Sequence, residues 1–235
     1  MDCCFALQET LENFGCGQLA ATAHQVAETL GRAVDAKDRR LFEHSTLTAE
    51  LATFLALAHG LTRKQAGSIH IAGHLHDIGK IGIPDAVLQK PGALTPAEWG
   101  LIREHPRIGS VILAPMEIFA AKNGVRDMVL THHERFDGSG YPHGLAGQDI
   151  PLGGRILAIA DSVAAMLEAR VYRASLTFEQ AAEAIERGAG RLYDPELCRA
   201  FLLRASEAER LVERTTRAVE PGNQPGDQSG WATAS

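Results

Sequence analysis

Two groups of histidine and acidic residues are the part of this sequence best suited to chemistry. His76 and Asp77 are followed by Lys80, and the pair His132 and His133 precedes a glycine-rich loop. Neighbouring imidazoles and carboxylates are costly to bury in apolar surroundings unless a cation binds them. We therefore interpret the two groups as parts of one metal site, with a helix C-terminal cap as the alternative role for His76.

Two further polar residues lie on apolar helix faces and are therefore expected to point into the core. His44 shares a helical face with Leu47, Leu51 and Leu55, so its imidazole points inward. Asp161 interrupts a strongly apolar helix and has no Arg or Lys within one turn on either side. A buried carboxylate of this kind needs a cationic partner, which a metal ion supplies. A lone inward histidine is more often hydrogen-bonded structure, so His44 is a candidate only together with the other groups.

Histidines at helix junctions complete the candidate set. His105 precedes a proline that can open a helix, and alone it would be a surface residue in most proteins. His132 and His133 end an apolar helix, so at least one of them must face inward. His76 and Asp77 are neighbours, and adjacent helical side chains diverge by about 100°. One ion can therefore bind His76 and one oxygen of Asp77, while the second oxygen of Asp77 reaches another ion. The candidate metal ligands are His44, His76, Asp77, His105, His132, His133 and Asp161.

The remaining histidines are expected not to bind metal. They lie on helix faces shared with polar residues or in a loop, without an acidic neighbour, and they are His24, His59, His70, His74 and His143. His74 is two residues before His76, an offset that places it on the opposite side of the helix.

The elements that must position these residues are helices. Apolar residues recur with a period near 3.6 and no long alternating pattern occurs, so the sequence predicts an all-α fold. Capping residues mark helix starts at Thr62, Thr95, Thr177 and Asp194. The expected helices are 5–33, 38–59, 63–77, 96–104, 106–121, 124–133, 153–169, 178–187 and 195–213. Two loops rich in Gly and Pro, 79–94 and 134–152, each follow a histidine group, where site-forming loops belong.

Length and composition suit one main domain, since the chain has 235 residues of which 45% are apolar. We expect a short N-terminal helical extension at 1–37, the main domain at 38–214 and a disordered tail at 215–235. The net charge of −6, without a basic tract, argues against a nucleic-acid polymer as ligand. The absence of a signal-like start, of an apolar run near ~20 residues and of a C-x-x-C spacing predicts a cytoplasmic protein with free thiols and no membrane segment.

Taken in order, these residues resemble the HD-GYP family, a branch of the HD metal-dependent phosphohydrolases. The resemblance covers about residues 38–205 and rests on the runs 76–84, 90–95 and 132–142. It implies an HD-domain helical bundle that hydrolyses cyclic di-GMP to pGpG, and often onward to GMP, by attack of a hydroxide that bridges two metal ions.

The resemblance also implies a role for each ligand candidate. It assigns His44, His76, Asp77 and Asp161 to one ion, and Asp77, His105, His132 and His133 to the other. Iron or manganese is expected at both positions, and nitrogen and oxygen ligands without sulfur suit these metals. Asp77 and Lys80 are the expected catalytic residues.

Substrate and partner contacts are implied in the same way. Lys80 resembles the family lysine that contacts the substrate phosphate or the bridging solvent, although elsewhere it would be an ordinary surface lysine. Arg170 and Arg173 are similar to a basic pair that holds the second phosphate or a guanine edge. The loop with Gly140, Tyr141 and Pro142 is expected to shape the site and to offer a surface to diguanylate cyclases or adaptor proteins. The N-terminal helices are a candidate surface for a homodimer.

Three departures from the family pattern keep alternatives open. Arg40 stands where members with a third metal carry Glu, so two metals are expected, while Ala164 replaces an aspartate that many members keep and Val171 replaces a common proline. A weakly active or inactive module that binds cyclic di-GMP or a partner is therefore one alternative. An HD phosphohydrolase acting on another nucleotide is the second, although the intact Gly-Tyr-Pro loop argues against it.

Overall fold

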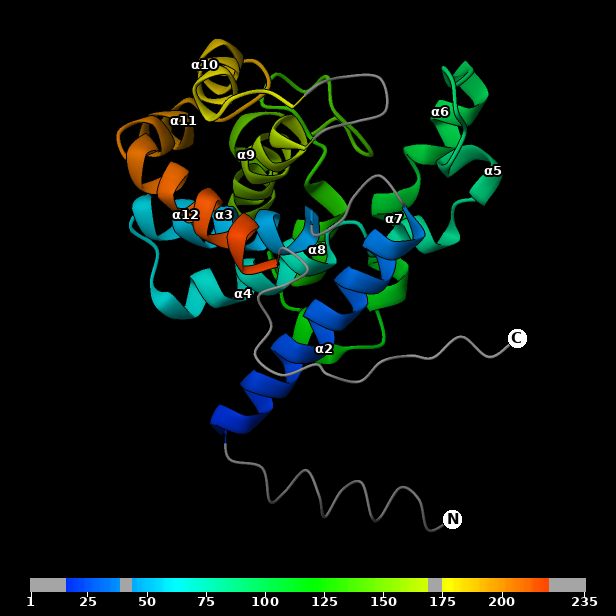
Figure 1. The fold of residues 1–235 in the computed structure, drawn as a ribbon. Helices are drawn as coiled ribbons and strands as arrows, with labels where there is room; N and C mark the ends of the chain where they lie inside the picture. Colours follow the sequence, from blue (N-terminus) through cyan, green and yellow to red (C-terminus); the bar gives the residue numbers. More distant parts are fainter. Residues whose placement is uncertain (1–15, 39–43, 169–174, 220–235) are drawn as a thin grey trace, which may run out of the picture.

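The computed structural model describes residues 16–38, 44–168 and 175–219, and over these ranges the chain forms helices without a β-strand (Figure 1). The α-helices are α2 (Cys16–Lys37), α3 (His44–Ala58), α4 (Arg63–Leu75), α5 (Asp85–Leu88), α6 (Pro96–Ile102), α7 (His105–Leu113), α8 (Val125–Thr131), α9 (Leu152–Leu167), α10 (Phe178–Gly188), α11 (Pro195–Leu202) and α12 (Ala205–Val219). Short 3-10 turns are η1 (Ile78–Gly82), η2 (Glu117–Phe119) and η3 (Gly147–Asp149). The predicted all-α class is confirmed.

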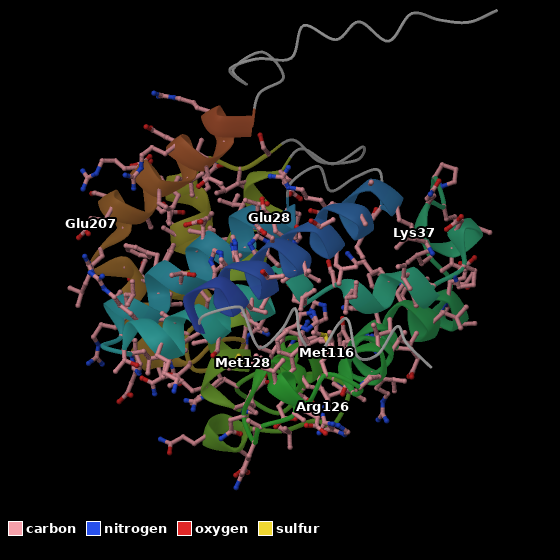
Figure 2. The ribbon with its side chains drawn as sticks, turned by 90° about the horizontal axis from the view of Figure 1, so that it is seen from below. Glu28, Lys37, Met116, Arg126, Met128 and Glu207 are labelled. Atoms are coloured by element: carbon pink, nitrogen blue, oxygen red, sulfur yellow. The ribbon has the colours of Figure 1, made fainter. Side chains whose placement is uncertain are left out.

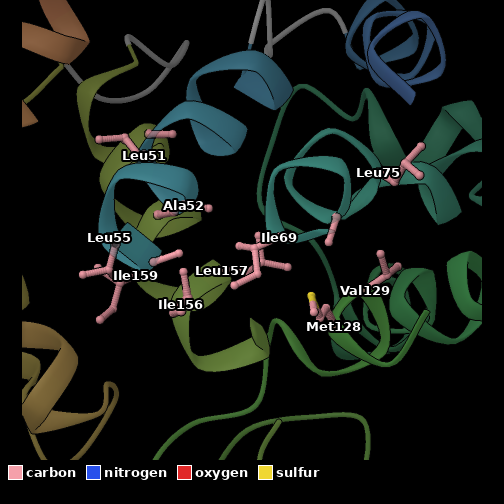
Figure 3. Packing of buried hydrophobic residues seen from close by; sticks show 14 of the residues in the cluster. Leu51, Ala52, Leu55, Ile69, Leu75, Met128, Val129, Ile156, Leu157 and Ile159 are labelled. Carbon is pink, nitrogen blue, oxygen red and sulfur yellow. The ribbon is translucent and has the colours of Figure 1, made fainter. Parts of the chain in front are cut away.

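Helices α3, α4 and α9 form the centre of the fold, and α8 packs beside α4 and α9 (Figure 3). Leu51 and Leu55 of α3, Ile69 of α4 and Ile156 of α9 are each no more than 2% exposed. Full burial of such a side chain contributes about 1.5–3 kcal/mol. The apolar core therefore fixes the helices that carry several of the candidate ligands.

Helix α2 packs on α4, α3 and η1 and does not stand apart from the main domain (Figure 2). Near its C-terminal end, Asp35 accepts hydrogen bonds from the backbone N and Oγ of Ser45, at 3.1 and 2.7 Å. Lys37 donates to the carbonyls of Ile81 and Ile83, at 2.8 and 3.0 Å. The described part of the N-terminal extension is thus tied to the start of α3 and to the turn after α4.

Four predicted helix starts agree with the structure. Thr62, Thr95 and Thr177 each form a complete capping box, in which the hydroxyl accepts the N3 amide and the N3 side chain accepts the N-cap amide. Asp194 caps α11, with Pro195 in its first turn. These starts are local signals, so sequence alone locates them.

Several predicted helix ends and one loop were wrong. The helix expected at 106–121 stops at Leu113, because Pro115 lacks the amide donor that would continue the helical hydrogen bonds. The helix expected at 195–213 is divided into α11 and α12, and α12 continues to Val219, which contradicts a disordered tail from residue 215. The loop expected at 79–94 contains most of η1 and all of α5. Residues 1–15 and 220–235 lie outside the described part of the chain.

Among the described helices, none combines the length and the apolar character needed to cross a membrane.

Candidate metal centre

All seven predicted ligands come together where the ends of helices α3, α4, α7 and α8 meet the middle of α9. Each residue except Asp161 begins an α-helix or lies within two positions of the end of one. Their ligand atoms form two groups, and the atoms of each group lie within 4.8 Å of one another: His44, His76 and Asp161 in the first, Asp77, His105, His132 and His133 in the second. The structure therefore juxtaposes residues that are up to 117 positions apart in the sequence.

Asp77 lies between the two groups. Its Oδ2 is 3.3 Å from Nε2 of His76, and its Oδ1 is 3.2 Å from Nε2 of His105. In the first group, Oδ1 of Asp161 is 3.0 Å from Nε2 of His44 and 3.8 Å from Nε2 of His76. One carboxylate thus presents a separate oxygen to each group, the arrangement expected of a ligand shared by two ions.

Backbone carbonyls orient three of the imidazoles. Nδ1 of His76, His105 and His132 lies 2.7 Å from the carbonyl oxygen of the residue three positions earlier, in the last turn of the preceding helix. These carbonyls can only accept, so each Nδ1 donates its proton to the carbonyl and leaves Nε2 as the ring nitrogen that faces the site. His76 therefore does cap α4, and this capping role is compatible with metal binding.

One structural feature, independent of the family resemblance, indicates that these residues can bind a cation. Nε2 of His76 is fully buried and has no hydrogen-bond partner among the described residues. A buried polar atom without a partner costs free energy, and an ion bound at this nitrogen would remove that cost. The imidazole and carboxylate ligands, with no sulfur among them, suit a divalent transition metal.

Charges around the site favour the ligand forms of its residues. Burial opposes ionisation of Asp77, yet Lys80 and His76 hold its pKa well below the usual range. Burial, with the neighbouring His105, lowers the pKa of His133 to about 3. Asp77 is therefore ionised and His133 neutral at neutral pH, and these are the protonation states that bind metal.

His44 differs because two carboxylates flank it. Burial opposes its charge, but Asp161 and Glu168 together raise its pKa to about 10. Nδ1 of His44 is 3.2 Å from Oε1 of Glu168. A histidine between two carboxylates is a common arrangement around metal ions, where the outer carboxylate orients the ring. Sequence reasoning missed Glu168, although its position two helical turns after Asp161 was a usable signal.

The close approach of η1 to α7 requires a glycine. A Cβ at Gly79 would overlap the carbonyl of His105 and the amide of Gly109. Because Gly79 has none, the turn after Asp77 can lie against the first residue of α7. This contact brings Asp77 and His105 within reach of one another.

A cavity of about 380 Å³ lies over both ligand groups. Besides every ligand candidate except His76, its walls include Lys80, Trp99, Arg135, Tyr141, Ser162 and Tyr193. This volume is in the range of about 300–1,000 Å³ that small-molecule sites occupy. The predicted loop residue Tyr141 is part of the cavity, and its ring centroid is 4.8 Å from that of His133.

Lys80 lies at the edge of the first group. Its Nζ is 2.7 Å from Oδ2 of Asp77 and 3.4 Å from Oδ2 of Asp38. Burial alone would lower the pKa of Lys80, but these two carboxylates raise it. The ammonium group is therefore charged and held in place beside the cavity.

Glu134 is not a ligand candidate, and it organises the loop that follows it. Its carboxylate accepts the backbone amides of His143 and Leu145, at 2.7 and 3.1 Å. Arg107 donates to the carbonyl of Pro142 at 3.2 Å, and the guanidinium of Arg103 lies 5.5 Å from the centroid of the Tyr141 ring. These contacts hold the Gly-Tyr-Pro loop over the cavity.

Some predicted residues are not placed. Arg170, Arg173, Arg40 and Val171 lie outside the described residues. Ala164 is fully buried among apolar side chains of α9, and it is not among the residues of the cavity wall.

Comparisons with known proteins agree on one family. The HD domain family model matches residues 28–197. A cyclic di-GMP phosphodiesterase from Thermotoga maritima is 38% identical over 210 residues, which are 89% of this chain and 56% of that protein. A 3'3'-cGAMP-specific phosphodiesterase 2 from Vibrio cholerae is 38% identical over 184 residues, which are 78% of this chain and 35% of that protein. This chain thus spans about half, or less, of the length of these relatives.

The fold has counterparts among solved structures. A crystal structure of a cyclic GMP-AMP specific phosphodiesterase from Vibrio cholerae superposes with a TM-score of 0.60 at 16% identity, covering 84% of this chain and 53% of that chain. At this identity the likeness concerns the fold alone. Together with the family match and the relatives, it shows that the chain belongs to the HD domain family and, within it, to the HD-GYP phosphohydrolases.

Proposed function

We propose that this chain hydrolyses cyclic di-GMP to pGpG, GMP or both, in a reaction that depends on two divalent metal ions. The observation that carries the proposal is the position of Asp77, which presents one oxygen to each of two ligand groups at the floor of a cavity. The name of the Thermotoga maritima relative supports cyclic di-GMP as the substrate.

The ligands divide as the family resemblance implies. His44, His76 and Asp161 would hold one ion and His105, His132 and His133 the other, with Asp77 shared. Iron or manganese suits this nitrogen and oxygen set. When bound, two such ions stabilise charge on phosphoryl oxygens as Lewis acids and make water a better nucleophile at neutral pH.

The chain's own residues bind and orient the substrate. The Lys80 ammonium is charged and held at the cavity edge, where it can donate to a phosphoryl oxygen. Arg135 offers a second positive charge in the cavity wall, and Trp99 and Tyr141 offer aromatic faces for guanine bases. Arg170 and Arg173 remain predicted contacts to the second phosphate or a guanine edge.

Reconstitution with metal tests the proposal directly. The protein, purified without oxygen, is analysed for metal content and then assayed with cyclic di-GMP under Fe(II) and under Mn(II). We expect metal-dependent formation of pGpG or GMP, and in Asp77→Ala we expect loss of activity together with loss of the Fe or Mn bound at this centre. Wild-type turnover in Asp77→Ala would refute the shared-ligand role. Binding of cyclic di-GMP without product by the metal-loaded wild type would favour the non-catalytic module instead.

A second candidate substrate is 3'3'-cGAMP, because relatives with this specificity are as similar to the chain as those that act on cyclic di-GMP. Both are dianionic cyclic dinucleotides, so the same ions and Lys80 would serve either one. They differ in one purine base, which must be discriminated by the cavity wall. Competition between the two substrates, with a linear mononucleotide as a third competitor, measures the preference and also tests the alternative of another nucleotide substrate.

Protein partners remain proposals of the same kind. The loop with Tyr141 and Pro142 is held in place by Glu134 and Arg107, so a diguanylate cyclase or adaptor protein would meet a formed surface. A homodimer through the N-terminal helices is likewise proposed, and sedimentation of the full chain tests it.

A further inference from the structure

Three histidines that the sequence analysis set aside lie together on the far side of α4 from His76. His24 comes from α2, and His70 and His74 are one turn apart on α4. Nε2 of His70 is 2.9 Å from Nε2 of His24 and 3.3 Å from Nε2 of His74. One nitrogen of each ring can be chosen so that all lie within 4.8 Å of one another. We call this group the α2–α4 cluster.

The cluster is separate from the candidate metal centre. His74 and His76 differ by two positions, which places their side chains about 200° apart around the helix axis. The three-histidine group contains none of the seven ligands described above. The cluster is therefore distinct from the centre at Asp77.

A hydrogen-bond chain fixes the tautomer of the central ring. The hydroxyl of Thr53 donates to the carbonyl of Ala49 at 2.7 Å, so its one proton is already used. Nδ1 of His70 lies 2.8 Å from the same hydroxyl oxygen and must donate to it. The neutral ring therefore keeps a lone pair on Nε2, the atom that faces His24 and His74.

This arrangement is poorly satisfied without a cation. The single lone pair on Nε2 of His70 can accept one hydrogen bond, yet two imidazole nitrogens face it. A divalent ion would instead accept a lone pair from each of the three rings. Two nitrogens at about 2.0–2.1 Å from a tetrahedral zinc lie ~3.4 Å apart, which is close to the observed separations.

The surroundings are suitable for a positive ion. His74 is buried, whereas His24 and His70 are half-buried, so solvent can reach the cluster from one side. Glu50 and Glu28 lie near enough to act electrostatically on His70, while Arg32, which pairs with Glu28 at 2.8 Å, acts on His74. Burial lowers the pKa of His70, which favours its neutral, metal-binding form at pH 7.

We infer that His24, His70 and His74 bind a zinc ion whose fourth position is open to water, and that this ion fastens α2 to α4. The backbones are already in close contact here, since a Cβ at Gly31 of α2 would lie 2.6 Å from the carbonyl oxygen of His74. Asp35 near the C-terminal end of α2 contacts Ser45, and Asp38, which directly follows α2, contacts Lys80. The zinc ion would therefore hold the helix whose end supports Lys80.

Zinc stoichiometry of the full chain tests the inference. Equilibrium dialysis against Zn²⁺ is carried out on the wild type, on His24→Ala and on His59→Ala, a matched control in which a histidine outside both groups is removed. We expect His24→Ala to bind one equivalent fewer than the wild type, and His59→Ala to bind the same amount. Equal stoichiometry in the wild type and a folded His24→Ala would overturn the site.

A second variant and a second measurement guard against misfolding. His70→Gln changes the other helix and should lose the same equivalent. With Co²⁺ as the probe, the visible absorption of a tetrahedral site should appear in the wild type and be missing in both variants. Helix content measured by circular dichroism in chelator should match the wild type. Zinc retained in full by either folded variant would contradict the inference.

The Asp77→Ala background separates this site from the phosphodiesterase proposal. In that background, Zn²⁺ should still raise the melting temperature, by about 5 °C at saturating metal, and addition of His24→Ala should abolish the difference. If the metal-loaded wild type lacks phosphodiesterase activity while Asp77→Ala shows this shift, the proposed function is refuted and the zinc site stands. An unchanged shift after His24→Ala would refute the zinc site.

Discussion

The two histidine groups on opposite sides of α4 differ in their carboxylates. At the metal centre, Asp77 and Asp161 lie among the imidazoles and supply negative charge within 3.0 to 3.8 Å of His44, His76 and His105. In the α2–α4 cluster, the three rings face one another and no carboxylate belongs to the group. Carboxylates allow ions to be shared and their charge to be offset, so the first arrangement suits two ions and an anionic substrate. Three imidazoles suit a single zinc ion with water in its fourth position.

The largest expected effect is on catalysis, and it should appear at the centre only. His132→Ala removes a ligand candidate whose ring is oriented by the carbonyl of Val129. We expect kcat/KM for cyclic di-GMP to fall on the order of 10³-fold or more, because the charge stabilisation supplied by one ion is lost. His70→Ala should reduce it by less than ~10-fold. Similar losses of kcat/KM in both variants would show that the metal centre and the α2–α4 cluster do not differ in their contribution to catalysis.

A smaller catalytic effect is expected at Lys80. Lys80→Ala removes the ammonium group beside Asp77 but leaves every ligand candidate in place. We expect kcat to fall by about 10²-fold, the cost of removing one charged donor to a transition state. Metal content measured on the same sample should stay at the wild-type level. Loss of metal in this variant would show that Lys80 positions Asp77 for metal binding and does not act on the substrate.

A still smaller effect, on zinc affinity, is expected at Thr53, which orients His70 in the α2–α4 cluster. Thr53→Val removes the hydroxyl that accepts Nδ1–H of His70 but retains its shape. Loss of such an outer partner typically weakens metal binding by about 10–100-fold. We expect a drop of this size in zinc affinity, measured by chelator competition, with phosphodiesterase activity unchanged. Zinc affinity equal to that of the wild type would show that Thr53 does not prepare His70 for zinc binding by fixing its tautomer.

The smallest effect concerns the stability of the metal-free protein. Carboxylates raise the pKa of His44 from 6.5 to about 10 in the fold, against the opposing effect of burial. A group whose pKa is raised by folding stabilises the fold below its unfolded pKa, and that contribution is lost as the pH rises through the folded value. The melting temperature of the chelated protein should therefore fall by a few degrees between about pH 6.5 and pH 10. The fall should be smaller in His44→Gln and persist in His70→Gln.

Sequence reasoning was most successful where the signal was local. The capping boxes at Thr62, Thr95 and Thr177 located three helix starts because both partners of each box lie within four residues. The break between α11 and α12 has neither Gly nor Pro at Leu203 or Arg204. There, Arg204 pairs with Glu207 and lies over the ring of Phe54, so packing across the fold determines the break.

The same distinction applies to the sites. The seven ligand candidates could be selected because each was a polar residue at an apolar helix end or within an apolar helix, and the structure brings them together. The α2–α4 cluster could not be found in this way, since it depends on how α2 packs on α4. The spacing of His70 and His74, one turn apart, was the only readable part, and nothing in the sequence paired them with His24.

The carbonyl contacts of His76, His105 and His132 link folding to ligand placement. Each ring occupies an acceptor in the final turn of α4, α6 or α8 that would otherwise lack a donor from its own helix. One side chain therefore ends a helix and aims a nitrogen at the same time, so these positions serve architecture and reactivity jointly. An engineer who replaced such a histidine to change metal preference would also have to supply a new helix terminator, and a terminator chosen for stability alone would leave the nitrogen misdirected.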